Sequence, residues 1–163
     1  MEIVISDTNI FIDLWNIGLL ERFCELPLSI HTTDFIIGEL KTQGVRDAIA
    51  QLHQEGKITI KTFKSNEYAE IISLQDKNLS FQDCTVLYYA LNGDYKLLTG
   101  DRNLRVIAER HGLQVSGIIY VMDELLHYGI LSKEEYITKL KALLESNHRL
   151  PTKEIMKRIE DSL

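Results

Sequence analysis

Short apolar runs alternate with longer amphipathic segments over the first two thirds of the chain. Such runs are typical of buried strands, and they lie at residues 2–6, 28–31, 57–62, 96–99 and 113–115. The segments between them predict helices at residues 10–15, 19–26, 35–40, 46–54, 66–75 and 103–111, with a further helix that begins after Ser80. This alternation predicts an α/β domain in which a short-stranded parallel sheet carries helices on both faces.

The last part of the chain has only helical patterns. They predict helices at residues 118–128, 133–147 and 153–162. No stretch rich in Gly, Ser or Pro separates residues 118–163 from residues 1–117. The total length of 163 residues is that of one domain. We therefore expect an α/β domain at 1–117 and a helical extension at 118–163 that packs on the same domain.

Composition narrows the functional classes. The chain has 18 Lys and Arg against 24 Asp and Glu, so its net charge of −6 excludes nucleic-acid binding by overall charge alone. The two cysteines, Cys24 and Cys84, cannot form a disulfide framework and lack metal-ligand spacing. No stretch approaches the roughly 20 apolar residues of a spanning helix, and no signal segment opens the chain. We expect a cytoplasmic protein that does not bind membranes.

Four acidic residues stand where a parallel α/β sheet binds ligands, outside the carboxyl ends of its strands. Asp7 directly follows the first strand and Asp101 the fourth, while Asp83 lies in the first turn after Ser80 and Glu39 in the helix after the second strand. We expect these carboxylates to converge in one cleft, where mutual repulsion favours a bound divalent cation. Oxygen ligands predict Mg²⁺ or Mn²⁺ rather than zinc.

Two pieces of sequence carry a family resemblance. Ile-Ser-Asp-Thr-Asn-Ile-Phe-Ile at residues 5–12 and Leu-Leu-Thr-Gly-Asp-Arg-Asn-Leu at residues 97–104, with Glu39 and Asp83, resemble the signature of the PIN domain. That family is similar to the 5′-nucleases and includes ribonuclease toxins of toxin–antitoxin pairs. The resemblance covers residues 1–117, and the extension, with residues 144–151, is similar to a PIN-like subgroup with additional C-terminal helices.

The resemblance implies a three-layer α/β/α fold with strand order 3-2-1-4-5 and a metal-dependent endoribonuclease that uses Mg²⁺ or Mn²⁺. It implies four metal-binding acids that are also catalytic: Asp7, Glu39, Asp83 and Asp101. Asn9 would orient the first aspartate and Thr99 would support the last. A toxin would also have an antitoxin protein as partner, and the apolar helices would permit a homodimer. The best candidates for binding RNA phosphates are Arg46, Arg102 and Arg105.

Each of these residues also has a structural interpretation. Asp7 and Asp101 are suited to capping helices, Ser80 and Asp83 have the spacing of a capping box, and Glu39 and the arginines are suited to solvated helix faces. A catalytically inactive PIN-like module that binds RNA or protein is therefore the alternative function. A phosphatase of the aspartyl-phosphate type is a third, disfavoured alternative, because it needs a second acid where Asn9 stands.

Overall fold

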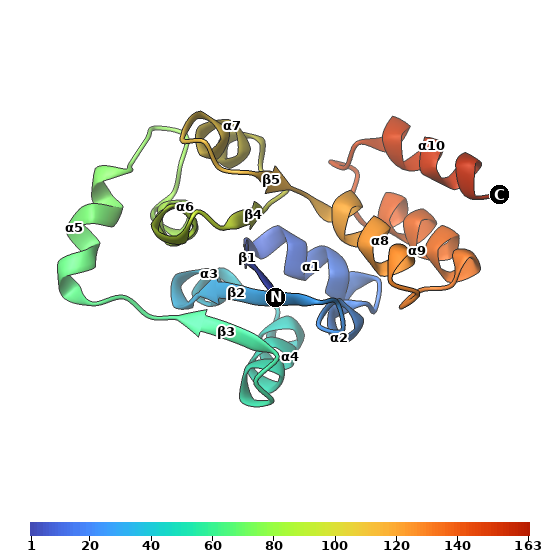
Figure 1. The fold of residues 1–163 in the computed structure, drawn as a ribbon, viewed down its shortest axis with the longest axis horizontal. Coiled ribbons are helices and arrows are strands. Elements are labelled where there is room, and N and C mark those ends of the chain that lie inside the picture. Colours follow the sequence, from blue (N-terminus) through green and yellow to red (C-terminus); the bar gives the residue numbers. More distant parts are fainter.

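The computed structural model describes residues 1–163 and contains one parallel sheet of five short strands (Figure 1). The strands are β1 (Glu2–Ser6), β2 (Leu28–Thr33), β3 (Ile58–Lys61), β4 (Lys96–Leu98) and β5 (Val115–Ser116). Their order is β3-β2-β1-β4-β5, which confirms the predicted topology. In the pairing register, Ile5 of β1 stands between His31 of β2 and Leu97 of β4. β1 is therefore the central strand.

Ten helices surround the sheet: α1 (Thr8–Asn16), α2 (Leu20–Phe23), α3 (Asp34–Glu39), α4 (Gln43–Gln54), α5 (Ser65–Ser73), α6 (Phe81–Gly93), α7 (Arg102–Arg110), α8 (Ile118–His127), α9 (Lys133–Ser146) and α10 (Thr152–Ser162). None of them combines the length and the apolar character that crossing a membrane requires. The predicted helix at residues 19–26 is shorter than expected, because the chain turns at Cys24.

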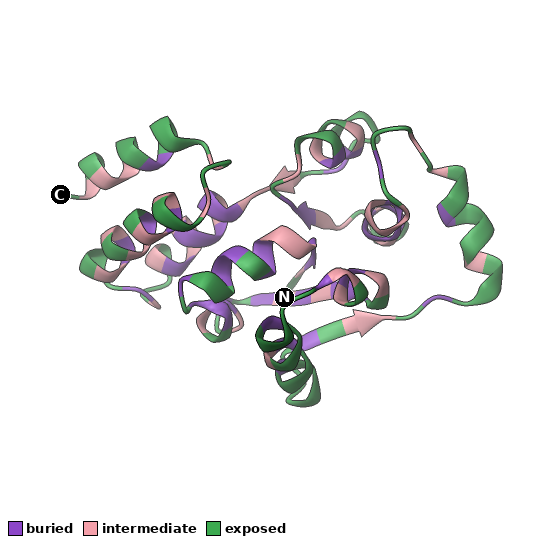
Figure 2. Cartoon of the chain, turned by 180° about the vertical axis from the view of Figure 1, so that it is seen from behind, coloured by how far each residue is buried: buried purple, intermediate pink, exposed green.

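Successive side chains of β1 point to opposite faces of the sheet, and each face has its own hydrophobic cluster. Val4 belongs to the larger cluster, which α1, α2, α4 and α8–α10 complete. Ile5 belongs to the smaller one, with residues from α3, α5, α6 and α7. Both side chains are fully buried. Buried positions accordingly follow the strands and the inner sides of the helices in Figure 2, and the predicted three-layer α/β/α architecture is confirmed.

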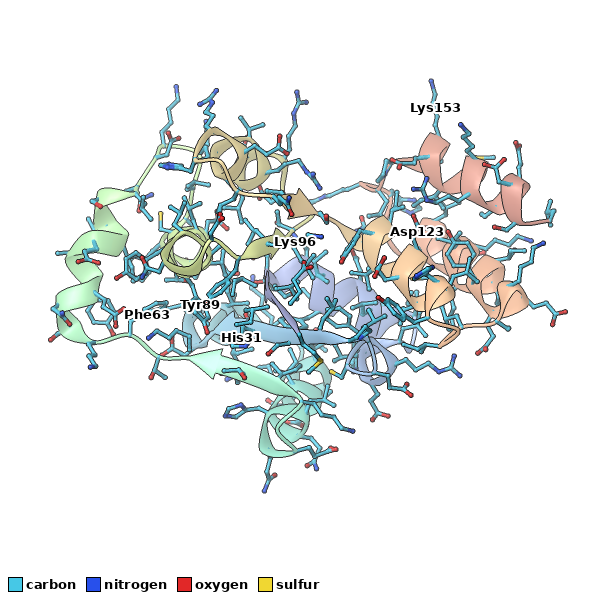
Figure 3. All side chains as sticks on the ribbon, in the orientation of Figure 1. His31, Phe63, Tyr89, Lys96, Asp123 and Lys153 are labelled. Carbon is cyan, nitrogen blue, oxygen red and sulfur yellow. The ribbon has the colours of Figure 1, made fainter.

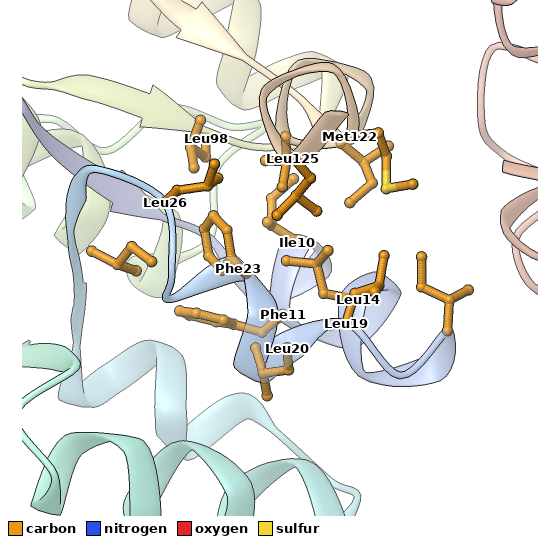
Figure 4. Close-up of a cluster of buried hydrophobic side chains, with 14 of the residues drawn as sticks. Ile10, Phe11, Leu14, Leu19, Leu20, Phe23, Leu26, Leu98, Met122 and Leu125 are labelled. Atoms are coloured by element: carbon orange, nitrogen blue, oxygen red, sulfur yellow. The ribbon is translucent and has the colours of Figure 1, made fainter. Parts of the chain in front are cut away.

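The C-terminal helices share the larger cluster with α1 and α2. Met122 and Leu125 of α8 face Ile10 and Leu14 of α1 in the close-up of this cluster (Figure 4). Helix α9 adds fully buried leucines to the same cluster, and α10 packs on α9. Residues 118–163 are thus joined to the sheet by a continuous apolar interior, which covers one end of the domain.

The fifth strand differs from the prediction. It was expected at residues 113–115, but it consists of Val115 and Ser116. Leu113 is used instead to end α7: Gly112 adopts φ +84°, and the Leu113 N–H donates to the Ala108 carbonyl at 3.1 Å. This Schellman-type ending occupies the backbone of Leu113, so strand pairing begins only after it.

Candidate active site

The site is organised around Asp7, at the carboxyl end of the central strand. Its side chain is 4% exposed, and its backbone N–H donates to the Leu98 carbonyl on β4 at 2.9 Å. One carboxylate oxygen, Oδ1, accepts from the N–H of Thr8 at 2.8 Å and so caps α1. The other, Oδ2, accepts from the Thr99 hydroxyl at 2.7 Å and from the Asn9 amide at 3.4 Å. Both oxygens are therefore held in place by neighbouring donors.

Thr99 and Asn9 connect the ends of β1 and β4. While it donates to Asp7, the Thr99 hydroxyl accepts from the backbone N–H of Asp101 at 3.0 Å. The Asn9 side chain also joins the segment after β1 to the segment after β4, because its Oδ1 accepts from the Gly100 N–H at 2.8 Å. A Cβ at Gly100 would stand 3.4 Å from that Asn9 oxygen, so the approach is close. Both side chains thus contact the Asp7 carboxylate. Thr99, which the resemblance assigns to the last aspartate, touches Asp101 only through its backbone N–H.

Asp83 and Asp101 both cap helices, as their structural interpretation predicted. Asp83 Oδ2 accepts from the N–H of Ser80 at 2.9 Å, and the Ser80 hydroxyl accepts from the N–H of Asp83 at 3.0 Å. Asp101 Oδ1 accepts from the N–H of Leu104 at 3.0 Å, at the start of α7. Capping uses one oxygen of each carboxylate and fixes its direction, so a capping role and a catalytic role are compatible in the same residue.

Glu39 reaches the site from the end of α3. Its Oε2 accepts from the hydroxyl of Thr8, the first residue of α1, at 2.6 Å. This contact joins two segments that are 31 residues apart in sequence and brings Glu39 to the residue next to Asp7. Sequence reasoning missed Thr8, although its place between Asp7 and Asn9 was the available signal.

Electrostatic coupling shows that the acids form one group. Burial raises the pKa of Asp7 to about 7, against the opposing effect of the Thr99 and Thr8 hydrogen bonds, and the charges of Asp83 and Glu39 raise it further. The pKa of Asp83 is also raised, mainly by burial and in part by the charge of Asp101. Each acid therefore lies within electrostatic range of at least one other member of the group.

The expected convergence is nevertheless only partial. No three His, Cys, Asp or Glu side chains lie close enough together to hold one metal ion. Neighbouring donors hold both oxygens of Asp7 and one oxygen of each other acid, and like charges repel. The structure brings Asp7, Glu39, Asp83 and Asp101 to one end of the sheet but does not bring them into ligand distance of a common point.

The chemistry of the donors still fits a hard divalent cation. Asp83 Oδ1, Asp101 Oδ2 and Glu39 Oε1 accept no hydrogen bond from the protein. No buried side-chain oxygen or nitrogen lacks a partner, so these three oxygens are open to solvent. An all-oxygen donor set beside a buried carboxylate is the type of site that Mg²⁺ and Mn²⁺ occupy. Inward movement of these exposed oxygens would relieve the repulsion once a cation is bound.

Two of the three candidate RNA-binding arginines lie next to this group. Arg102 and Arg105 line a cavity of about 600 Å³ that also includes Thr99 and Gly100. Arg46 lies on α4, on the opposite side of the molecule from α7 in Figures 1 and 2, and it does not line this cavity. The structure thus separates Arg46 from the other two.

Comparisons with known proteins bear on the family and the fold of this chain. A family model described as a PIN domain, DUF3368, matches residues 3–162. Among solved structures, a domain of a functionally unknown protein from Methanocaldococcus jannaschii DSM 2661 is similar, with 20% sequence identity and a TM-score of 0.48. That match covers 72% of this chain and 91% of the other. A search of curated proteins found no match.

Proposed function

This chain belongs to the PIN-domain family, and we propose that it is an endoribonuclease that hydrolyses RNA phosphodiester bonds with Mg²⁺ or Mn²⁺. The family membership confirms the resemblance, and PIN domains are generally nucleases. One observation supports the proposal for this chain: Asp7 is buried at the end of β1, and its pKa is raised mainly by that burial and further by the charges of Asp83 and Glu39. A buried acid among other acids is costly to ionise unless a cation neutralises it.

Asp7, Asp83 and Asp101 are the residues that would hold the cation, with Glu39 beside them directly or through water. A bound cation would supply positive charge at the scissile phosphate and would acidify an attacking water. The chain supplies no histidine in contact with these acids, so the carboxylates themselves are left to orient that water and to accept its proton.

The supporting residues hold this arrangement before substrate arrives. The Thr99 hydroxyl donates to Asp7 and accepts from the Asp101 backbone, so it links the ends of β1 and β4. Asn9 adds a second bridge between the same two strands. Groups that are already oriented do not have to reorganise during the reaction, which is the main source of electrostatic catalysis.

The direct test is cleavage of a single-stranded RNA by the wild type, Asp101→Asn and Asp7→Asn with Mg²⁺ or Mn²⁺. We expect cleavage by the wild type, none with EDTA, and none by either variant. Asp94→Asn is the matched control, because it makes the same change at an exposed residue. Asp94 lies at the C-terminal end of α6, whereas Asp83 lies in the first turn of that helix. Undiminished cleavage by Asp101→Asn would refute the proposed role of that residue.

A second measurement separates an enzyme from an inactive binding module. Titration with Mg²⁺ or Mn²⁺ should raise the melting temperature of the wild type, because the cation binds only the folded acid group. Asp101→Asn should reduce this rise and Asp94→Asn should not. A wild type that binds RNA, is not stabilised by either cation and does not cleave would be the binding module.

The toxin role implied by the resemblance is a finer prediction of the same proposal. Induced expression of the wild type in a bacterial host should then arrest growth, and expression of Asp101→Asn should not. Growth at the normal rate with active enzyme present would contradict the toxin role but not the ribonuclease activity.

A further inference from the structure

A cavity lies between the α/β domain and the helical extension. Its volume is about 600 Å³. One wall is the start of α7 with the junction between β5 and α8, and the opposite wall is the loop at residues 147–151 with α10. These walls are separate in Figure 1, where α7 and α10 stand on either side of the β5–α8 connection. The cavity is therefore a site that neither part of the chain could form alone.

Its lining is basic, in contrast to the acidic chain. Four arginines and two acids line it: Arg102, Arg105, Arg149, Arg158, Asp123 and Glu154. One arginine, Arg158, pairs with both acids, at 2.9 Å from Asp123 Oδ2 and 3.2 Å from Glu154 Oε1. Figure 3 labels Asp123 on the side of α8 that faces the C-terminal helices. Arg102 and Arg149 make no ion pair and are exposed, so they are available to bind an anion.

The basic cavity continues into the candidate active site. A second cavity of about 270 Å³ is lined by Asn9 and Asp101. Gly100, Arg149 and Leu150 line both cavities. Arg149 therefore lies where the basic cavity meets the cavity that Asp101 lines.

The loop that carries Arg149 is anchored to the helix that begins at the acid group. Asn147 donates its amide to Asp13 Oδ1 at 3.0 Å, and Asn147 Oδ1 accepts from the backbone N–H of Arg149 at 3.0 Å. Asp13 is 6% exposed and lies four residues after Asn9, on the same face of α1. Both the loop and Asp7 are thus positioned by α1.

We infer that Arg149 binds a backbone phosphate of single-stranded RNA beside the phosphate that is cleaved. The inference rests on the proposed ribonuclease function and extends it to the extension. Arginine suits this role because its planar guanidinium donates two parallel hydrogen bonds to phosphate oxygens. Ile119, Leu150 and Pro151 line the same cavity and offer apolar surface to a base. A cavity of about 600 Å³ is large enough for part of a single strand.

The test measures binding without cleavage, by fluorescence anisotropy of a labelled oligouridylate in EDTA. Arg149→Ala should weaken binding about tenfold, and the slope of log affinity against log salt should fall by roughly 0.7. Arg149→Lys should recover part of the affinity, since lysine keeps the charge without the paired donors. Lys153→Ala is the matched control: Lys153 is exposed, lies outside the cavity lining and points away from the domain in Figure 3. It should bind like the wild type.

Cleavage kinetics give the second readout and separate the two proposals. Arg149→Ala should raise KM more than it lowers kcat, with an unchanged melting temperature, because Arg149 is exposed and contacts no buried group through its side chain. Wild-type affinity in Arg149→Ala, with normal cleavage, would overturn the inference and leave the ribonuclease intact. Equal weakening by Lys153→Ala would overturn it as well, since diffuse charge would then explain binding. A wild type that neither binds nor cleaves RNA would overturn both.

Discussion

The acid group and the basic cavity are built in opposite ways. Every acid is held by a backbone or side-chain donor at a strand end or a helix start, and Asp7 is almost completely buried. The unpaired arginines of the cavity are exposed, and the Arg149 loop is held through one hydrogen bond between residues 134 apart, Asn147 and Asp13. Burial strengthens electrostatic effects in the first region, while solvent screens them in the second.

The acid group is part of the α/β domain itself, whereas the basic cavity depends on how the helical extension packs against that domain. In the acid group, Asp7 and its supporting residues Asn9 and Thr99 connect the ends of β1 and β4. The wall formed by residues 147–151 and α10, which carries Arg149 and Arg158, is here called the arginine wall. It can be altered by substitutions in the extension, which contacts the acid group only through α1 and the shared cavity lining. Variants in the two regions should therefore have separable effects on stability, cation binding and RNA binding.

The largest expected effect is on the pH dependence of stability without metal. The pKa of Asp7 rises from 3.8 to about 7 on folding, so between these pH values the folded state binds more protons than the unfolded state. The free energy of unfolding must then fall as the pH rises through this window and level off above it. The expected loss is about 4 kcal/mol for this residue. Urea unfolding in EDTA at pH 4.5, 6 and 8 measures it.

Asp7→Asn should remove most of this dependence and be more stable than the wild type at pH 8 in EDTA. Saturating Mg²⁺ or Mn²⁺ should reverse the order, because the wild type gains a cation that the variant binds poorly. Asp94→Asn should keep the wild-type pH dependence. An equal pH dependence in wild type and Asp7→Asn would show that Asp7 is not the buried carboxylate responsible.

The second effect concerns the anchor of the arginine wall. Asn147→Ala leaves the buried Asp13 carboxylate without its only side-chain donor, which should cost about 2 kcal/mol of unfolding free energy. Burial already raises the pKa of Asp13 and the Asn147 hydrogen bond opposes this, so the variant should raise that pKa further. Urea unfolding measures the cost. His148→Ala, an exposed neighbour in the same loop, is the control and should unfold like the wild type.

The same variant sharpens the separation between the two regions. Asn147→Ala should weaken oligouridylate binding, because the Arg149 loop loses its anchor, but the stabilisation by Mg²⁺ or Mn²⁺ should stay unchanged. A loss of cation-induced stabilisation in this variant would mean that the extension shapes the acid group as well.

Local sequence patterns were sufficient to predict that Asp7 and Asp101 follow parallel strands at one end of the sheet. The positions of Asp7 and Asp101 follow from the rule that polar residues gather after parallel strands, and the Ser80–Asp83 spacing predicted a capping box that is present. The resemblance singled out Asn9 and Thr99, but it did not predict that the Thr99 hydroxyl donates to Asp7 rather than to the Asp101 carboxylate. The partial convergence of the acids was missed, because the sequence shows which strand and helix ends carry them but not how far apart their side chains lie.

Local sequence patterns did not predict the arginine wall. Arg149 sits in a short break between two helices, and nothing near it in sequence indicates that Asn147 meets Asp13. The available signal was Asp13 itself, an acid at an otherwise apolar position of α1, one turn after Asn9. A buried acid requires a partner, but sequence alone does not identify which distant residue supplies it.

The smallest expected effect tests what attaches the extension to the domain. Arg22 of α2 and Glu135 of α9 form an ion pair at 2.6 Å, and their side chains are 40% and 42% exposed. Exposed pairs contribute little because water and salt screen them, so Arg22→Met should lower the free energy of unfolding by under about 1 kcal/mol. Leu140→Ala, in the fully buried part of α9, should cost about 3 kcal/mol by comparison. If Arg22→Met cost as much as Leu140→Ala, the ion pair rather than the apolar interior would hold the arginine wall in place.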